Sequence, residues 1–317
     1  MTEEQLEGRI LYGINNIYTV EVDGRRLSCR IRGKVLRSSR GRRERAEYNP
    51  LAVGDRVRIT PDPHSEEKGW IRERLERSTW LTRYNKNRRA PQVLAANVDL
   101  LVCVASAGQP PFRPRFLDRM LVSAHAGRVE PTIFVNKSDL GVGPDVPSRP
   151  EAYRSCGYTV LIGSALEERG LEELRALLHG KTVAFVGQSG VGKSLLLNRL
   201  DPELDLKVGE ISEKYNRGGH TTNFAAMVNI DPDTRVIDTP GIRELDLYGL
   251  EPEELGHYFP EFDAPAADCG FSSCRHLDEP GCAVKEAVSR GGIHPDRYES
   301  YVRMYLHLEE LREQQHG

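Results

Sequence analysis

The sequence predicts a multidomain protein with three parts. These are an N-terminal OB-type β-barrel over residues 1–90, a circularly permuted α/β P-loop domain over residues 91–250 and a mainly helical zinc-binding domain over residues 251–317. Three observations predict them: short β-like runs in the first part, a strand–glycine loop–helix motif in the second, and a cysteine–histidine cluster in the third. A chain of 317 residues is long for one domain and suits two or three.

The N-terminal part is rich in short β-like runs. Residues 17–22 and 26–31 flank Asp23-Gly24, a pair typical of a two-residue hairpin turn. Further β-like runs cover residues 55–60 and 70–72. Several short strands without a helical pattern between them predict a small barrel of the OB type.

The middle part alternates between apolar runs and helical patterns. The helical patterns include residues 115–125 and 171–178. The strand-like runs are residues 98–106, 132–135, 159–162, 182–186 and 236–237. Continuous apolar strands between amphipathic helices indicate a buried, mostly parallel sheet that is covered on both faces.

The C-terminal part ends in a predicted helix over residues 296–314. Apolar and aromatic residues recur there at helical spacing, which gives the helix one apolar face. They are Tyr298, Tyr301, Val302, Tyr305 and Leu308.

A phosphate-binding loop follows the strand predicted over residues 182–186. The pattern Gly-x4-Gly-Lys-Ser stands between a strand and a helix, which is the context that a P-loop requires. We expect Lys193 to reach the β- and γ-phosphates and Ser194 to coordinate Mg²⁺. The expected nucleotide contacts are Gly187, Gln188, Ser189, Gly190, Val191, Gly192, Lys193, Ser194 and Leu195. The alternative is a glycine-rich turn with no ligand.

A guanine-selecting segment precedes the P-loop instead of following it. It consists of Asn136, Lys137, Ser138 and Asp139. The Asp139 carboxylate can accept hydrogen bonds from both N1–H and the exocyclic amine of guanine, a donor pair that adenine lacks. The motifs thus predict GTP and GDP as ligands, and their rotated order predicts a circular permutation. Such a rearrangement preserves the site, because loops at the carboxyl ends of parallel strands converge whatever their chain order.

Two weaker motifs complete the predicted site. Ser164 and Ala165 follow a strand and could offer a backbone N–H to the guanine carbonyl, although a simple strand-end turn is equally compatible. Asp238 begins an Asp-x-x-Gly segment; its carboxylate is expected near Mg²⁺, and the N–H of Gly241 near the γ-phosphate.

The residue that orients the attacking water is not obvious. Ile242 stands where many GTPases carry a glutamine, and its side chain cannot hydrogen-bond water. His220 lies between the P-loop and the Asp-x-x-Gly segment, so we predict that it is catalytic together with Lys193 and Asp238. The alternative is a solvent-exposed loop histidine. Thr221 or Thr222 is expected to bind Mg²⁺.

Three thiols and one imidazole lie within fourteen residues. They belong to Cys269, Cys274, His276 and Cys282. Four such ligands predict one structural Zn²⁺ site with no open coordination position. Iron–sulfur binding fits the histidine and the spacing less well, and the remaining alternative is a set of reduced cysteines.

Basic residues are concentrated near the N-terminus, although the whole chain has a net charge of only −3. Between residues 25 and 45 a single acid, Glu44, interrupts them, which favours RNA-backbone binding over a solvated charge run. They are Arg25, Arg26, Arg30, Arg32, Lys34, Arg37, Arg40, Arg42, Arg43 and Arg45, with a second group at Arg83, Lys86, Arg88 and Arg89.

Targeting signals are not visible in the sequence. No apolar run approaches the roughly 18 residues of a membrane span, and the acidic start Met1-Thr2-Glu3-Glu4 does not resemble a signal peptide. Six cysteines in a chain of this length do not suggest a disulfide framework. We therefore expect a cytoplasmic protein, no membrane partner and a monomer.

With these motifs in place, the chain resembles the small ribosomal subunit biogenesis GTPase RsgA (YjeQ) family. The resemblance covers nearly the whole length and rests on residues 53–57, 96–99, 117–119, 136–139, 187–194, 219–222, 238–241 and the cysteine–histidine cluster. It implies an OB domain, a permuted GTPase domain and a zinc domain. It also implies binding to the 30S subunit and its 16S rRNA late in maturation, with GTP hydrolysis stimulated there.

Two positions depart from the family pattern. Asn223 stands where a third threonine is common, and Gly219 stands where a longer side chain is usual. Both leave nucleotide binding intact but blur whether Thr221 or Thr222 binds Mg²⁺. Gly190 stands where potassium-dependent GTPases often carry asparagine, so potassium dependence is less expected.

Three other functions compete with this interpretation. An ATP-using P-loop enzyme conflicts with Asn136 to Asp139, and an RNA-binding scaffold with a degenerate nucleotide site conflicts with the intact Lys193, Ser194 and Asp238. A GTPase that acts on a non-ribosomal RNA shares every motif and differs only in the family resemblance.

Overall fold

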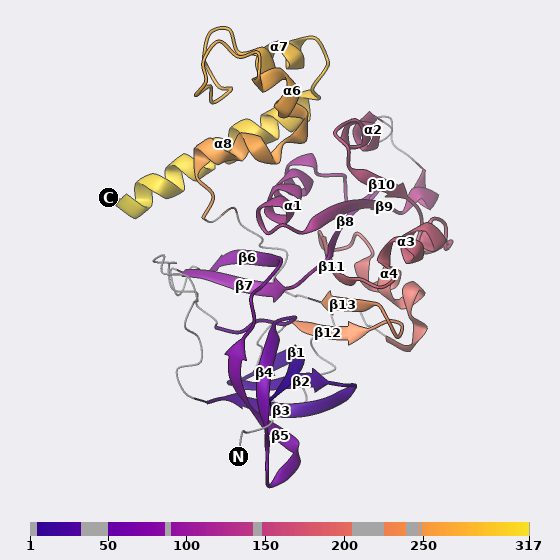
Figure 1. The fold of residues 1–317 in the computed structure, drawn as a ribbon. Coiled ribbons are helices and arrows are strands. Elements are labelled where there is room, and N and C mark those ends of the chain that lie inside the picture. The colour runs from indigo at the N-terminus through magenta and orange to yellow at the C-terminus, as the bar shows by residue number, and fades with distance from the viewer. Residues whose placement is uncertain are drawn as a thin grey trace.

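A computed structural model describes residues 5–32, 50–85, 90–141, 148–204, 225–238, 247 and 249–316. Figure 1 shows three parts in chain order: a barrel near the N-terminus, a sheet flanked by helices, and a helical C-terminal part. Within the described residues, no helix combines the length and the apolar character that crossing a membrane requires.

The N-terminal barrel is confirmed. Its strands are β1 (Leu6–Ile14), β2 (Ile17–Val22), β3 (Arg25–Ile31), β4 (Arg56–Asp62) and β5 (Ser65–Arg74). They close in the order β1-β2-β3-β5-β4, with only β3 and β5 parallel. Asp23 and Gly24 both have positive φ, as the predicted hairpin turn requires. Alternate residues such as Val20, Cys29 and Ile71 point inward and form the barrel core.

A separate hairpin joins the barrel to the sheet. Strands β6 (Trp80–Asn85) and β7 (Ala90–Ala96) pair antiparallel. The sequence patterns missed this hairpin, because four of the seven residues of β7 are alanine or proline, which are depleted in strands.

The predicted parallel sheet is also confirmed. It has the order β10-β9-β8-β11-β13-β12 and contains β8 (Leu100–Ser106), β9 (Glu130–Asn136), β10 (Thr159–Ile162), β11 (Thr182–Gly187), β12 (Ala226–Asn229) and β13 (Arg235–Asp238). Five of these strands are parallel, and β12 runs antiparallel at the edge next to β13. That edge strand is short and was not predicted.

Helices cover both faces of the sheet. They are α1 (Pro114–Ala126), α2 (Ser148–Ser155), α3 (Leu171–Leu178) and α4 (Lys193–Leu200), with short 3-10 turns η1 (Ser138–Leu140) and η2 (Pro202–Leu204). Strand β8 is buried on both sides: Leu101 and Cys103 pack in the core with α1, whereas Leu100 and Val102 pack in the core with α3 and α4. This is why its sequence reads as a continuous apolar run.

The C-terminal part is mainly helical, as predicted. It comprises the 3-10 segments η4 (Pro252–Tyr258) and η5 (Pro260–Phe262) and the helices α6 (Asp263–Ala266), α7 (Ala283–Ser289) and α8 (Pro295–His316). Tyr301, Tyr305 and Leu308 are buried, and Tyr298 and Val302 pack against the same core, so the predicted apolar face of the terminal helix is confirmed.

Candidate nucleotide site and metal centre

The predicted nucleotide motifs leave the sheet at one edge. Strands β9, β10, β11 and β13 are parallel, so their carboxyl ends lie together. Asn136 is the last residue of β9, Gly187 the last of β11 and Asp238 the last of β13. Ser164 follows β10 by two residues. The rotated chain order therefore does not separate the motifs in space.

The P-loop links the buried strand β11 to helix α4. Gly190 and Gly192 have φ of +79° and +97°, a backbone conformation that glycine adopts without strain. The Lys193 ammonium donates hydrogen bonds to the carbonyls of Gly187 (2.6 Å) and Gln188 (2.9 Å) and so folds back over the loop. Ser194 and Leu195 lie in the first turn of α4. The N–H groups at the start of this helix can receive an anion.

Asn136 ties three motif loops together. Its side chain is 1% exposed. Its Nδ2 donates to the carbonyl of Val191 in the P-loop (2.9 Å), and its Oδ1 accepts from the N–H of Ala165 (2.9 Å). A Cβ at Gly192 would lie 2.5 Å from Asn136 Nδ2, so only glycine fits there. Asn136 therefore holds the loops in register, and its amide keeps a second N–H and a second lone pair for the base.

Asp139 is oriented by a neighbouring hydroxyl. The Ser164 hydroxyl donates to Asp139 Oδ1, and it also accepts from the N–H of Glu167 (3.2 Å). A serine hydroxyl has one proton, so the second Asp139 oxygen makes no bond with it. The carboxylate is thus placed as an acceptor for two N–H donors on one edge of a planar ligand.

Lys137 shows a contact that the sequence did not reveal. Its φ is +66°, and its ammonium donates to the carbonyl of Gln109 (2.6 Å) in the loop after β8. That loop also approaches the P-loop, because a Cβ at Gly190 would lie 3.7 Å from Pro110 Cδ. Gln109 contributes a backbone oxygen that any residue could supply, so no sequence signal could have identified it.

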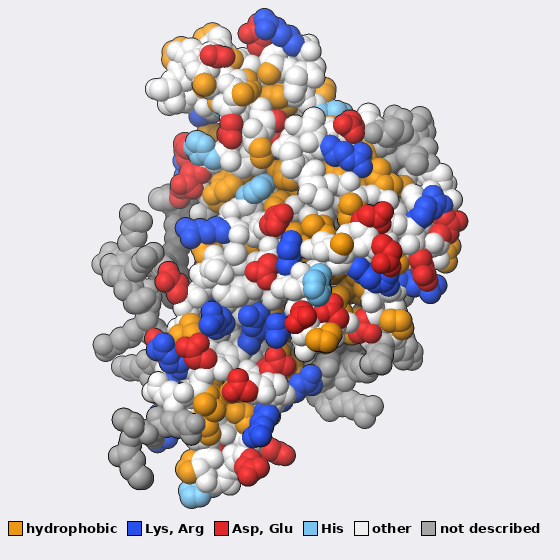
Figure 2. Space-filling view, turned by 45° about the vertical axis from the view of Figure 1, so that its right-hand side comes forward, with side chains coloured by type: hydrophobic (Ala, Val, Ile, Leu, Met, Phe, Trp, Pro, Cys, Tyr) orange, Lys and Arg blue, Asp and Glu red, His pale blue; other side chains and the backbone are white. Residues whose placement is uncertain are grey.

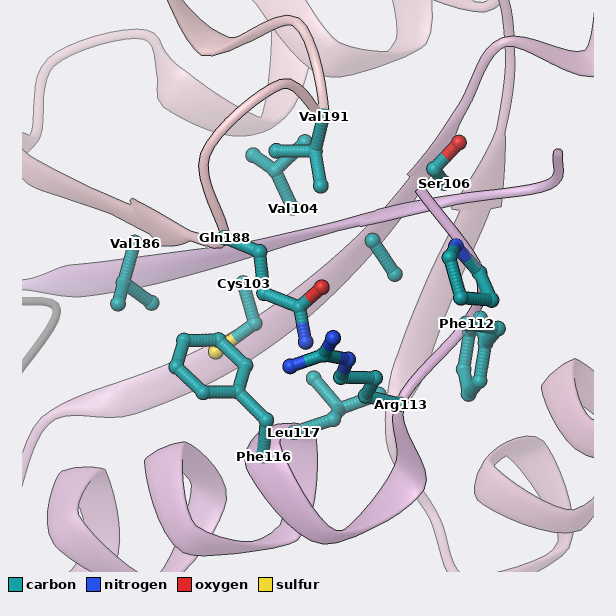
Figure 3. Close-up of a pocket in the computed structure, with 12 residues that line it drawn as sticks. Cys103, Val104, Ser106, Phe112, Arg113, Phe116, Leu117, Val186, Gln188 and Val191 are labelled. Atoms are coloured by element: carbon teal, nitrogen blue, oxygen red, sulfur yellow. The ribbon is translucent and has the colours of Figure 1, made fainter. Parts of the chain in front are cut away.

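A small cavity lies between the P-loop and the start of α1. Figure 3 shows the Gln188 amide and the Arg113 guanidinium close together at its edge, with Phe116 beside them. It has room for about one water molecule, so it cannot hold a nucleotide. Burial raises the pKa of the Cys103 thiol in its wall, which keeps this cysteine protonated and unreactive.

Several predicted site residues lie outside the described residues. These are His220, Thr221, Thr222 and Gly241. Asp238 is described as the end of β13, and its strand neighbour Ile237 pairs with Ala184 of the strand that leads into the P-loop. The side chain of Asp238 is not among the described ones.

The predicted metal ligands converge. Cys269, Cys274, His276 and Cys282 each offer an atom, and these atoms all lie within 4.8 Å of one another. The distances from His276 Nδ1 to Cys269 Sγ and to Cys282 Sγ are both 3.6 Å. Zinc bond lengths of about 2.3 Å to sulfur and about 2.0 Å to nitrogen give a tetrahedral edge of roughly 3.5 Å. The donor set therefore fits a tetrahedral zinc ion.

Aromatic residues hold the metal-ligand loop. The Tyr298 hydroxyl donates to the carbonyl of His276 (2.8 Å), and the Tyr301 hydroxyl donates to that of Arg275 (2.6 Å). His276 has a φ of +58° and its ring meets Phe262 edge-on at 5.7 Å. Helix α8 thus fixes the unusual backbone conformation that turns the imidazole toward the thiols.

Comparison with known proteins supports the barrel and the GTPase part. Residues 74–248 match the model of the RsgA GTPase family, and residues 7–71 match that of the RsgA N-terminal domain. Over 315 residues the chain is 40% identical to the small ribosomal subunit biogenesis GTPase RsgA of Chlorobaculum parvum, which covers 97% of this chain and 99% of that protein. It is 37% identical over 314 residues to RsgA 2 of Bacteroides thetaiotaomicron, with 96% and 98% covered.

Two solved structures share the fold. YjeQ from Thermotoga maritima superimposes with a TM-score of 0.76 at 35% identity, covering 96% of this chain and 99% of that one. YloQ, described as a circularly permuted GTPase, has a TM-score of 0.72 at 30% identity and covers 97% and 96%. The barrel, the rotated order of the nucleotide loops and these full-length matches agree: the chain belongs to the RsgA GTPase family and is a circularly permuted enzyme that hydrolyses GTP.

Proposed function

We propose that this GTPase binds the small (30S) ribosomal subunit, acts in its late assembly and hydrolyses GTP faster when bound there. The observation that carries the proposal is that relatives named small ribosomal subunit biogenesis GTPases align with 96–97% of the chain, including the barrel and the C-terminal part. A protein that shared only the nucleotide site would align over the middle part alone.

Co-sedimentation with 30S subunits tests this function. We expect more protein in the subunit fraction with a non-hydrolysable GTP analogue than with GDP, and a higher GTP turnover when subunits are added. Binding should weaken as salt rises, because contacts with phosphates release counterions. The protein could instead bind a non-ribosomal RNA more tightly, with a GTP turnover that does not change when 30S subunits are added. That result would support the alternative of a GTPase that acts on another RNA.

We propose that three groups of residues form the nucleotide site. The P-loop from Gly187 to Leu195 surrounds the phosphates, Ser194 with Asp238 and Thr221 or Thr222 holds Mg²⁺, and Asp139 reads the guanine edge with Ser164 and Ala165 beside it. The Lys193 ammonium already lies over the loop, 2.6 Å from the Gly187 carbonyl, which supports this role. Bound Mg²⁺ neutralises charge on the β- and γ-phosphates.

His220 is our candidate for orienting the attacking water. The motivation is Ile242, whose side chain replaces a hydrogen-bonding glutamine. We expect His220→Ala to lower kcat roughly 10²-fold or more, as the loss of a water-positioning group does, with little change in GTP affinity. The matched control is His179→Ala, an exposed histidine at the end of α3. Stopped-flow phosphate release measures both, and unchanged turnover in His220→Ala would remove this residue from the mechanism.

The barrel carries a surface suited to 16S rRNA. Strands β3 and β5 are parallel neighbours, and Arg30 pairs in register with Trp70. The Arg32 guanidinium lies 5.6 Å from the centre of the Trp70 ring. Residues 28–32 and 68–72 contain no acid. Arginine and an aromatic ring side by side suit a phosphate backbone and a stacked base.

The charge distribution favours the barrel as the RNA-binding part. On the face shown in Figure 2, Lys and Arg gather around the barrel and its junction with the sheet more than over the C-terminal part at the top. Residues 251–317 hold 14 acids against six Lys and Arg, so this part repels a phosphate backbone. The predicted basic residues between Lys34 and Arg45, and Lys86, Arg88 and Arg89, lie outside the described residues.

Substitutions on this barrel surface should separate stacking from charge. We expect Trp70→Ala to weaken RNA binding by about 1–3 kcal/mol with an unchanged salt dependence, and Arg30→Ala to reduce the slope of log K against log salt by about 1. The matched control is Arg58→Ala, because Arg58 already pairs with Glu73 at 2.7 Å. Fluorescence anisotropy on a 16S rRNA fragment measures all three. Equal effects of the three substitutions would contradict the proposed surface.

We also propose a structural Zn²⁺ bound by Cys269, Cys274, His276 and Cys282, one per chain. It would stabilise the metal-ligand loop and take no part in hydrolysis. The expected division of the chain is into residues 1–90, 91–250 and 251–317, with hairpin β6–β7 spanning the first boundary. A monomer that works in the cytoplasm is consistent with a ribosomal substrate.

A further inference from the structure

Helix α8 of the C-terminal part packs across helix α1 of the GTPase sheet (Figure 1). Val122 of α1 belongs to the C-terminal core together with Phe259 and Tyr305. Leu247, where the chain re-enters the described residues after β13, is buried in the same core. The two parts of the molecule thus share one apolar interface.

A buried arginine lies at the centre of this interface. Arg297, in the first turn of α8, has a side chain only 2% exposed. Its Nη1 donates to Asp118 Oδ1 of α1 (2.6 Å). Its Nε and Nη2 donate to the two carboxylate oxygens of Glu261 in η5 (2.6 and 3.0 Å). One guanidinium therefore joins a carboxylate on helix α1 to a carboxylate of the C-terminal part.

Residues from both parts shield this cluster from water. The Arg297 guanidinium lies 4.6 Å from the ring centre of Phe259, 5.4 Å from that of Tyr153 and 5.6 Å from that of Tyr158. The Tyr153 hydroxyl also donates to Asp118 Oδ1 (2.8 Å). The pKa of Arg297 is raised well above its usual value by Asp118 and Glu261, although burial alone would lower it. It therefore stays charged at any physiological pH.

We propose that Arg297 is an interdomain lock that fixes the C-terminal part on helix α1 in a single orientation, so that the zinc-binding part and the GTPase sheet move as one body. A guanidinium has a planar fork of donors with fixed directions. It reaches Asp118 Oδ1 and both oxygens of Glu261 together only when α1, η5 and α8 stand in one arrangement. An apolar contact of the same size lets the two helices slide past each other. A buried ion pair often contributes little net stability compared with such a contact. We therefore expect the Arg297 ion pairs to set the orientation of the C-terminal part more than its stability.

The lock lies one helix away from the nucleotide loops. Helix α1 begins after the loop that contains Gln109. The carbonyl of Gln109 accepts a hydrogen bond from the Lys137 ammonium. The orientation of the C-terminal part is therefore fixed relative to the guanine-binding side of the site. The lock belongs to the folded chain alone and does not depend on the ribosomal function proposed above.

The interface offers a matched control. Arg115 of α1 pairs with Glu299 of α8 at 2.6 Å, but these side chains are 55% and 47% exposed. This second ion pair joins the same two helices in water. If the buried geometry matters, Glu299→Gln should leave the orientation unchanged while Arg297→Lys disturbs it, since a single ammonium cannot reproduce the fork.

Interdomain distances test the lock. Spin labels are attached to bio-orthogonal amino acids at the exposed positions Glu173 in α3 and Lys285 in α7, which leaves the cysteines untouched. Pulsed dipolar spectroscopy on the full chain should give one narrow distance distribution for the unsubstituted protein and for Glu299→Gln. Arg297→Lys and Arg297→Met should give a broadened or second distribution, with GTP affinity within about twofold of the parent.

Single substitutions of Arg297 leave buried carboxylates unpaired and can unfold the interface. A triple variant without these charges avoids that problem. Arg297→Met, Glu261→Met and Asp118→Leu together remove every buried charge of the cluster. We expect this variant to fold, as judged by thermal unfolding, yet to retain the broadened distribution. A single narrow distribution in the triple variant or in Arg297→Lys would overturn the lock.

Discussion

Replacing Asp139 by Asn is expected to abolish the preference for GTP over ATP and to create a preference for xanthosine triphosphate. The Asp139 carboxylate is held by Ser164 and can accept two N–H donors. Asparagine turns one acceptor into a donor, which opposes the guanine amine but suits the oxygen that xanthine carries at that position. Hydrogen bonds to charged groups contribute about 1.5–3 kcal/mol each, so losing the one to the guanine amine lowers GTP affinity roughly 10- to 10²-fold, and the new donor–donor repulsion lowers it further.

Calorimetric titration with the three triphosphates measures this change. The gain of xanthosine triphosphate binding is the decisive result, because a misfolded variant cannot gain a ligand. The matched control is Glu172→Gln, which removes an exposed carboxylate on α3 and should leave all three affinities unchanged. If Asp139→Asn still discriminates between GTP and ATP, another residue reads the base and the assignment of the guanine site is wrong.

Removing the proposed zinc ion should unfold the loop that its ligands form. The ligands occupy a stretch with little regular structure between α6 and α7, so a bound metal would supplement the core packing there. Structural zinc sites contribute apparent binding free energies of about 10–16 kcal/mol. We expect Cys282→Ser, or treatment with a strong chelator, to release the metal and to unfold residues 267–282. Hydrogen exchange should rise there and also at Tyr298 and Tyr301, whose hydroxyls hold this loop.

Nucleotide binding provides the internal reference for this experiment, because the P-loop and the guanine loops are built from separate strands. Cys156→Ser is the matched control, since Cys156 is a half-buried cysteine outside the metal cluster. Elemental analysis should find one zinc per chain in the control and none in Cys282→Ser. A chelated protein with unchanged exchange over residues 267–282 would show that apolar packing alone maintains this loop.

Much of the nucleotide site could be predicted from residue spacing. Phosphate binding needs a glycine loop between a strand and a helix, and that pattern is local. The structure places Asn136, Val191 and Ala165 in direct contact, as the predicted convergence of loops requires. What the spacing did not reveal is that Asn136 also links the P-loop to the loop after β10. That role depends on which backbone groups lie opposite it across the strand ends, and these come from positions 29 and 55 residues away.

Contacts between the domains could not be predicted from the sequence. Leu117, Asp118 and Arg119 were noted as a motif, but nothing local indicates that Asp118 accepts a hydrogen bond from Arg297, 179 residues later. An Asp in an amphipathic helix is expected at the solvent-facing side, and here it is fully buried. The hairpin β6–β7 was missed for a related reason. The residues of β7 have a weak strand propensity, and the strand forms because it pairs with β6.

The three-part organisation, the guanine nucleotide and the metal donor set follow from residue patterns, because each depends on residues close together in the chain or on strands whose order does not matter. How these parts are joined depends on the folded arrangement. Three contacts show this: the hydrogen bonds of Asn136 to two loops, the Ser164 hydroxyl on Asp139, and the buried Arg297 cluster. Each depends on which groups, far apart in the chain, lie together away from water. Hydrogen-bond geometry there is set by packing, and packing is a property of the whole fold.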